Sequence, residues 1–190
     1  MNLTSWIFSV LLSIVPANSY STMHESENKM KERYASIADD MYAAIHESKP
    51  LFNGENAEMK EAALITSIAY FESGFNKNVD SGKIRGDNGN SWCLMQINIG
   101  KNKVPVGDAE MQQWTGQDLI KDRKKCFKVA IEYLRNSFKA CSGYTKSDVL
   151  SGYTAGRCIK NESKAAARWN FAGKIISNNP MPKAEVSDKS

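Results

Sequence analysis

The segment from Ala57 to Ser73 constrains the fold of this 190-residue chain more than any other stretch. Apolar residues recur along it at helical spacing and predict a mostly buried helix, in which Gly74 is a natural C-terminal cap. Glu72 then lies on the last turn of that helix, beside Phe71. The apolar residues that support the helix are Ala62, Leu64, Ile65, Ile68 and Ala69.

Further helices are predicted on both sides of this segment. An amphipathic helix precedes it, and a loop marked by Pro50 and Gly54 separates the two. Helical patterns return over 117–139, 147–150 and 162–177. Turn residues fill the stretch between, and Gly86, Asp87, Asn88 and Gly89 suggest the tip of a small hairpin. The fold class is therefore mainly α (α+β), with a small β-hairpin inserted after the buried helix. The preceding helix is predicted from Met30, Tyr34, Ile37, Met41, Ala44 and Ile45.

The two ends of the chain differ from this central part. The stretch from Trp6 to Val15 is apolar, uncharged and too short for a membrane span, which needs about 20 residues. It suits the apolar region of a signal peptide, with Ala17 and Ser19 as small residues before a cut after Ser19. The n-region lacks Lys and Arg, and an uncleaved anchor is the alternative. We therefore expect a signal peptide over 1–19, a polar lead-in over 20–29 and a disordered tail over 179–190.

Export would allow the cysteines to form disulfides. Four cysteines allow three pairings, and their spacing lacks the CxxC pair of a zinc site, so we expect no metal. A bond between Cys126 and Cys141 would require the helix between them to break, because 15 helical residues rise about 22 Å and bonded Cα atoms lie within about 7 Å. We favour Cys93–Cys126 with Cys141–Cys158, and four reduced thiols in the core are the alternative.

Charge and motifs exclude several function classes. The net charge of +4 is mildly basic, which fits an anionic polymer but does not indicate nucleic-acid binding. The stretch GDNGNS lacks the strand, the Lys and the helix start of a phosphate-binding loop, so we expect a turn there and no cofactor.

Glu72 has the features of a general acid. A carboxyl group among apolar side chains is harder to ionise, so it can stay protonated near neutral pH. A protonated carboxyl group in a cleft can donate a proton to the leaving oxygen of a glycosidic bond. The alternative is that Glu72 caps the helix or forms a salt bridge at its end.

Three motifs in order carry a family resemblance. The segments ALITSIAYFESGF, CLMQIN and GYTAG resemble the signature of lytic transglycosylases of the soluble-lytic-transglycosylase (SLT) type, in the lysozyme-like superfamily. The resemblance covers about residues 30–178 and implies a lysozyme-like domain there, with Glu72 as the catalytic acid. It also implies cleavage of the MurNAc–GlcNAc β-1,4 bond of peptidoglycan, with formation of 1,6-anhydro-MurNAc.

The resemblance also implies substrate-binding positions, namely Ser73, Met95, Gln96, Asn98 and Tyr153. Gln96 would hydrogen-bond a sugar, and the alternative is a structural amide that bonds the backbone. Ser73 would orient the substrate or Glu72, and the alternative is a hydroxyl at the helix end. The tyrosine at position 153 matches one whose hydroxyl points at the catalytic glutamate, with core packing as the alternative.

Three positions depart from the family pattern. Cys93 replaces a glycine before Leu-Met-Gln, which would strain the backbone if φ is positive there, and a disulfide could compensate. Thr154 replaces an asparagine, which puts a contact of that amide in doubt. Gly152 replaces an alanine, and we expect this change to be mild.

Other functions remain open from the sequence. A hydrolytic lysozyme would need a second carboxylate, for which Asp87 and Asp80 are the candidates. A non-catalytic glycan-binding scaffold is a third possibility, although Glu72 is intact. By resemblance, the enzyme would act in the periplasm, be secreted or belong to a virion, and remodel the wall for a secretion, conjugation, pilus or phage assembly. We expect peptidoglycan strands as its partner and no stable membrane span after signal cleavage.

Overall fold

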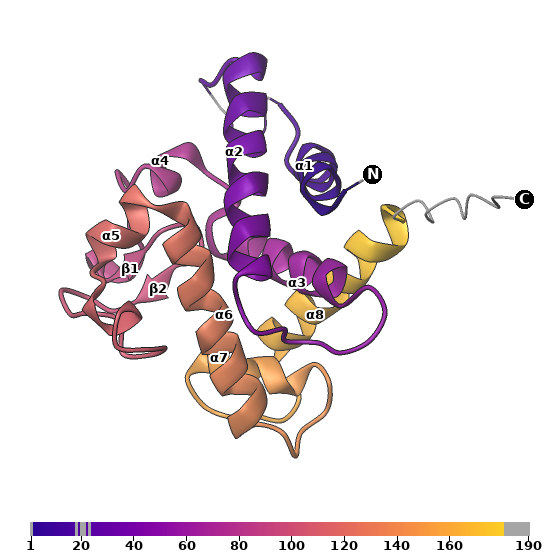
Figure 1. Cartoon of the computed structure of the whole chain (residues 1–190), viewed down its shortest axis with the longest axis vertical. Helices are drawn as coiled ribbons and strands as arrows, with labels where there is room; N and C mark the ends of the chain where they lie inside the picture. The colour runs from indigo at the N-terminus through magenta and orange to yellow at the C-terminus, as the bar shows by residue number, and fades with distance from the viewer. Residues whose placement is uncertain (1, 18, 20–21, 23, 181–190) are drawn as a thin grey trace, which may run out of the picture.

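The predicted buried helix is the centre of the structure. The computed structural model describes residues 2–17, 19, 22 and 24–180. Helix α3 (Ala57–Ser73) is buried without interruption from Glu61 to Ala69 and lies between other helices (Figure 1). It ends at Gly74, whose left-handed backbone (φ 56°) lets its N–H donate to the Tyr70 carbonyl. Glycine adopts this conformation without strain, so the helix stops directly after Glu72 and Ser73.

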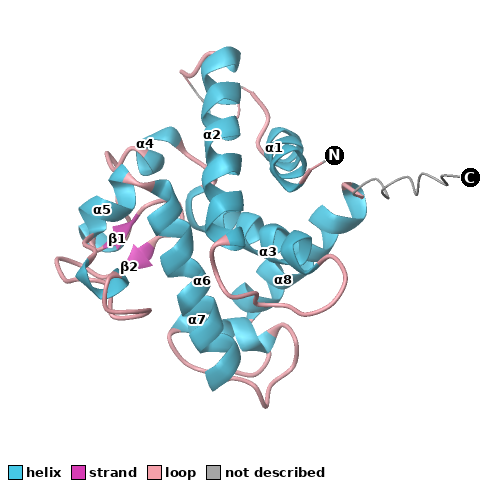
Figure 2. Ribbon diagram, viewed as in Figure 1, coloured by secondary structure: helices cyan, strands magenta, loops and turns pink. Residues whose placement is uncertain are grey.

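Helices dominate the remainder of the described chain, as predicted (Figure 2). Long helices α2, α6 and α8 pack around α3, while α1 packs against both α2 and α3. Shorter helices α4, α5 and α7 connect them, and a two-stranded antiparallel sheet follows α4. The remaining helices are α1 (Leu3–Ile14), α2 (Glu27–His46), α4 (Lys77–Asp80), α5 (Gly116–Lys121), α6 (Arg123–Ala140), α7 (Ser151–Ala155) and α8 (Ser163–Asn178).

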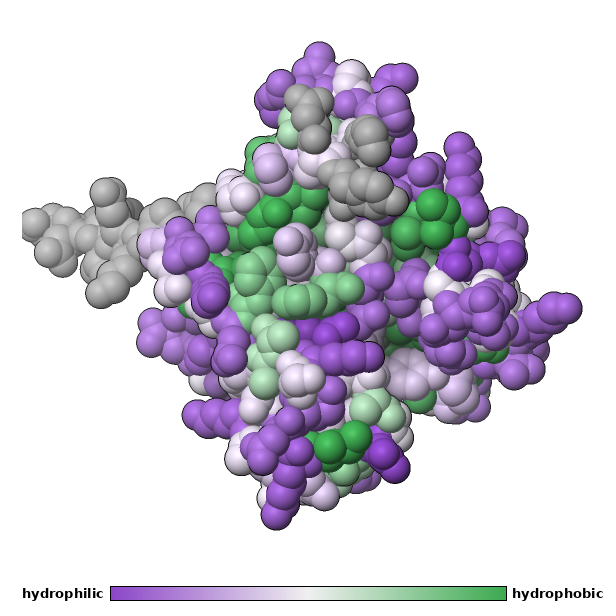
Figure 3. All heavy atoms as spheres, turned by 180° about the vertical axis from the view of Figure 1, so that it is seen from behind, coloured by the Kyte–Doolittle hydropathy of each residue, from purple (hydrophilic) through white to green (hydrophobic). Residues whose placement is uncertain are grey.

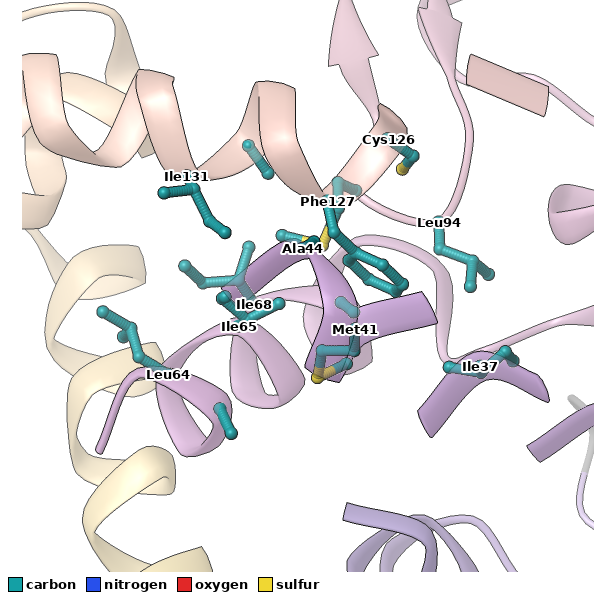
Figure 4. Close-up of a cluster of buried hydrophobic side chains, with 14 of the residues drawn as sticks. Ile37, Met41, Ala44, Leu64, Ile65, Ile68, Leu94, Cys126, Phe127 and Ile131 are labelled. Atoms are coloured by element: carbon teal, nitrogen blue, oxygen red, sulfur yellow. The ribbon is translucent and has the colours of Figure 1, made fainter. Parts of the chain in front are cut away.

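The core joins three helices to the hairpin (Figure 4). Side chains of α2, α3 and α6 meet Leu94, which is fully buried at the turn of the hairpin. Burying a side chain of this size contributes about 1.5–3 kcal/mol, so the hairpin is anchored to the helical body. The helical members shown include Ile37, Met41, Leu64, Ile65, Ile68, Phe127 and Ile131.

The predicted hairpin exists, but its tip was placed wrongly. Strands β1 (Ser91–Trp92) and β2 (Ile97–Asn98) pair antiparallel, and residues 93–96 turn between them. The expected tip instead forms the short 3-10 helix η2 (Asp87–Gly89) before β1. The turn forms at 93–96 because Leu94 and Met95 are buried there, a tertiary effect that turn composition does not reveal.

The helix predicted over 117–139 is two helices. Asp122 has an extended backbone (φ −133°, ψ 96°) and separates α5 from α6. Its side chain accepts a hydrogen bond from the Lys125 N–H, which caps the start of α6. The chain therefore changes direction at Asp122, and the fold class stays mainly α.

Both favoured disulfides are confirmed. Cys93 bonds Cys126, which ties the hairpin turn to α6, and Cys141 bonds Cys158, which ties the end of α6 to the loop after α7. Cys93 has φ 57°, so the strained backbone considered from the sequence is present and is held by a disulfide.

Helix α1 packs into the helical body. Trp6, Ile7, Val10 and Leu11 are fully buried, and the Trp6 indole donates to the Asn179 carbonyl over 2.6 Å. A cleaved signal peptide over 1–19 stays a prediction. No helix in the described ranges is long and apolar enough to cross a bilayer.

The predicted terminal segments overlap the described residues only in part. Helix α2 begins at Glu27, inside the expected lead-in, and Ser26 caps it. Most of the expected disordered tail, residues 181–190, lies outside the described residues, as do 20, 21 and 23 of the lead-in.

Candidate active site

A cavity of about 420 Å³ opens at the C-terminal end of α3. It is walled by the end of α3, η2, the hairpin, α6 and α7, which are five separate parts of the chain. The structure thus brings together all three motifs of the sequence resemblance. The lining residues are Glu72, Asp87, Gln96, Ile97, Asn98, Tyr133, Gly152, Tyr153, Thr154 and Gly156.

Glu72 is paired with an arginine, which the sequence did not predict. Its Oε1 accepts a hydrogen bond from Nη2 of Arg168 on α8 over 2.7 Å. The Arg168 side chain is 9% exposed and that of Glu72 is 23% exposed. Glu72 therefore does not lie among apolar side chains alone, and the salt bridge weighed as the alternative is present.

The aromatic residues close to Glu72 in sequence differ in how far they are buried. Tyr70 and Phe71 are 37% and 43% exposed, and they cluster with Phe171 of α8. The Phe71 ring lies 5.1 Å from the Arg168 guanidinium, and only Phe75 is fully buried. Figure 3 shows the face turned away from Figure 1, where apolar side chains form a patch beside strongly hydrophilic ones.

Of the two candidate second carboxylates, only Asp87 reaches the cavity. Its Oδ2 accepts hydrogen bonds from Ser91 Oγ over 2.5 Å and from Asn98 Nδ2 over 3.0 Å. Asp80 is instead buried in an ion pair with Arg123, at 2.7 Å. Asp80 is therefore a structural residue that holds α4 against α6.

Gln96 stabilises the hairpin with both ends of its amide. Its Oε1 accepts from the Gly86 N–H over 3.0 Å, and its Nε2 donates to the Cys93 carbonyl over 2.9 Å. These contacts match the structural alternative, although Gln96 also lines the cavity. Met95 is not among the residues that line the cavity, and its side chain is buried.

Tyr153 joins α7 to the hairpin. Its hydroxyl donates to the Met95 carbonyl over 3.0 Å, whereas the family resemblance implied a hydroxyl that points at the catalytic glutamate. Burial, and then the negative charge of Glu72, raise the pKa of Tyr153 well above its usual range. The phenol therefore stays neutral and keeps donating at any ordinary pH.

Ser73 does not line the cavity. Its Oγ donates to the Ala69 carbonyl over 2.9 Å and accepts from the Phe75 N–H over 3.3 Å. These are the contacts of a helix-end hydroxyl, as the structural alternative predicted.

The two remaining departures from the motif have clear contacts. Gly152 packs against Ser137 of α6 so closely that an added Cβ would lie 2.5 Å from the serine Oγ. Thr154 Oγ1 donates to Glu162 Oε2 over 2.8 Å, and Glu162 caps the start of α8. The threonine thus bonds within the fold, where an asparagine was expected.

Sequence reasoning missed Arg168 and Tyr133. Arg168 lies on the buried face of α8 with Ala165, Ala172 and Ile175, so the helical period could have flagged a buried charge. Tyr133 lines the cavity from α6, and burial raises the pKa of its phenol. No cluster of three or more His, Cys, Asp or Glu that could hold a metal occurs in the described part of the chain.

Comparison with protein families identifies the class that this fold and site define. The family model of the transglycosylase SLT domain matches residues 50–175, which is more than half of the chain. The protein therefore belongs to the SLT family of lytic transglycosylases, lysozyme-like enzymes whose substrate is peptidoglycan outside the cytoplasm. The two disulfides fit an extracytoplasmic protein. No curated protein and no solved structure gives a significant match.

Proposed function

We propose that the protein is a peptidoglycan lytic transglycosylase that cleaves the MurNAc–GlcNAc β-1,4 bond and forms 1,6-anhydro-MurNAc. Glu72 is the catalytic residue in this proposal. One observation carries it: a carboxyl group at the end of a rigid, buried helix lines a cavity that the other two family motifs also line.

The proposed mechanism needs only one carboxyl group. Protonated Glu72 donates its proton to the bridging oxygen as the bond from that oxygen to C1 of MurNAc breaks. The resulting carboxylate takes the proton of the C6 hydroxyl of the same sugar, whose oxygen then bonds C1 and closes the anhydro ring. Each step restores the form of Glu72 that the other step requires, and no water is consumed.

The surrounding residues support this assignment by holding the cavity wall. Asn98 and Asp87 bond each other across the hairpin base, and Tyr153 fixes the Met95 carbonyl. Asn98 is an exposed member of the lining, so we assign it a contact with a sugar hydroxyl or N-acetyl group. Gln96 and Tyr153 would act mainly by keeping the hairpin in place.

Product analysis tests this function. Purified sacculi are digested with the protein and with Glu72→Gln, and the soluble muropeptides are identified by mass spectrometry. We expect products ending in 1,6-anhydro-MurNAc from the native protein and none from the variant. Glu58→Gln is a matched control, because it makes the same exchange in the first turn of the same helix. Equal product from native protein and Glu72→Gln would contradict the proposal.

Hydrolysis is the second candidate, because Asp87 lines the same cavity as Glu72. A hydrolytic lysozyme would release reducing-end MurNAc, and Asp87→Asn would then abolish activity. Under the transglycosylase proposal, Asp87→Asn leaves the anhydro product unchanged in kind and only slows its release.

We further propose that the protein is exported and opens peptidoglycan locally for a larger assembly. A periplasmic or secreted enzyme fits the disulfides and the signal-like segment 1–19, while a virion location is a further option. The assembly would be a secretion, conjugation, pilus or phage structure. Cross-linking in cells, followed by identification of the captured proteins, tests this placement.

A further inference from the structure

Arg168 occupies an unusual position for a cation. It lies on α8, 96 residues after Glu72 in sequence, and is only 8% exposed as a residue. Its Nη2 donates to Glu72 and its Nη1 donates to the Lys164 carbonyl over 3.1 Å. Its Nε is buried and has no hydrogen-bond partner among the described residues. A buried guanidinium with an unmet donor is costly, so the pairing with Glu72 has to offset that cost.

The ion pair between Arg168 and Glu72 holds one oxygen of the carboxyl group and leaves the other oxygen open to the substrate. Oε1 accepts from Arg168, whereas the described residues give Oε2 no hydrogen bond. Phe71 lies over the guanidinium and restricts its access to water. The carboxyl group therefore cannot rotate freely, and one oxygen remains for the substrate.

The charged groups around Glu72 differ in sign. The guanidinium of Arg168 lies 2.7 Å from Oε1 of the carboxyl group and attracts negative charge on it. Tyr153 of α7 and Tyr133 of α6 are neutral phenols, and Asp87 adds a negative charge across the cavity. Glu162, which caps the start of α8, also experiences the positive charge of Arg168. Arg168 is thus the positive group in direct contact with the reacting carboxyl group.

We propose that Arg168 is a positioning residue that holds Glu72 by one oxygen and stabilises the carboxylate formed when Glu72 gives up its proton. This inference rests on the proposed function and deepens it. The positive charge makes proton donation to the bridging oxygen easier, because it offsets the negative charge that develops on the carboxyl group 2.7 Å away.

The rate of the reaction tests the proposal. Release of anhydro-muropeptides is measured as kcat and KM for the native protein, Arg168→Met and Arg168→Lys. Without the positive charge, kcat should fall by roughly 100-fold while KM changes little, because Arg168 contacts Glu72 and is not part of the cavity lining. Arg168→Lys should restore part of kcat, and Arg135→Met is a control, because Arg135 pairs with Glu132 instead. A folded Arg168→Met variant with unchanged kcat would overturn the proposal.

Thermal stability provides a test that needs no activity. Glu72→Gln leaves the buried guanidinium without a counter-charge and should lower Tm by about 2–8 °C. Adding Arg168→Met to this variant should recover part of the loss. An unchanged or raised Tm of Glu72→Gln would refute the pairing. If the native protein releases no anhydro product, the proposed function fails, and this thermal cycle still decides whether Arg168 holds Glu72.

Discussion

The Cys93–Cys126 disulfide allows the sharpest prediction about stability. We consider the double variant Cys93→Ala/Cys126→Ala, with Cys141→Ala/Cys158→Ala as the matched control. Both bonds involve helix α6, but only the first holds the hairpin that lines the cavity. The first variant should therefore lose both stability and activity, whereas the second should lose mainly stability.

The length of each closed loop sets the expected size of the stability loss. Cys93 and Cys126 are 33 residues apart, and Cys141 and Cys158 are 17 apart. Loop-closure entropy then gives about 3.7 kcal/mol for the first bond and about 3.1 kcal/mol for the second at 25 °C. For a domain of this size each kcal/mol shifts Tm by about 2–4 °C, so the first variant should melt about 7–15 °C lower.

Chemical denaturation and activity assays together decide the outcome. Unfolding free energies come from urea titrations with linear extrapolation, and rates of muropeptide release are taken well below each Tm. We expect the first variant to be the slower enzyme even where both variants are fully folded. A loss of less than about 1 kcal/mol would refute the loop-entropy reasoning. Equal rates for the two variants would show that the disulfide does not position the hairpin.

Three further predictions concern single residues. Burial raises the pKa of Glu61 to about 7 in the folded protein, against 4.5 for the exposed group, so the unfolding free energy should fall by about 2–3 kcal/mol between pH 4.5 and 7. Urea titrations should show that Glu61→Gln removes this pH dependence, and an equal fall in the unfolding free energy of the variant would refute the prediction. Tyr153→Phe removes the hydrogen bond to the buried Met95 carbonyl and should cost about 1–2 kcal/mol in the same assay, with no loss if that bond contributes nothing. Cys93→Gly/Cys126→Ala should be about 1 kcal/mol more stable than the double alanine variant, because glycine relieves the positive φ at position 93, and equal stability would argue against strain there.

The parts of the fold that were predicted depend on local signals. Long helices such as α2 and α3 were predicted from the spacing of their apolar residues, and Gly74 was correctly predicted to end α3. For the cysteines, helix geometry argued only against Cys126–Cys141, and the disulfides present are the favoured pairs Cys93–Cys126 and Cys141–Cys158. The family match bears out the resemblance that three short motifs suggested.

The parts that were missed depend on contacts distant in sequence. The hairpin turns at 93–96, where the helical body buries Leu94, although the local turn signal in the sequence lies at 86–89. Likewise, Glu72 and Arg168 meet only after α3 and α8 have packed. The helical periodicity of α8 could show that Arg168 faces inward, but it could not identify Glu72 as its partner.

The close packing of Gly152 against Ser137 has a consequence for engineering by family consensus. Restoring the family's usual alanine at position 152 would push a Cβ into the serine Oγ and to 3.1 Å from its Cα. That serine also donates to the Val149 carbonyl and accepts from the Tyr153 N–H, so it has little freedom to move aside. A substitution that looks conservative in a profile of the family would therefore disturb the contact between Ser137 and Tyr153, which lines the cavity. Ancestral or consensus libraries of this enzyme should vary positions 137 and 152 together.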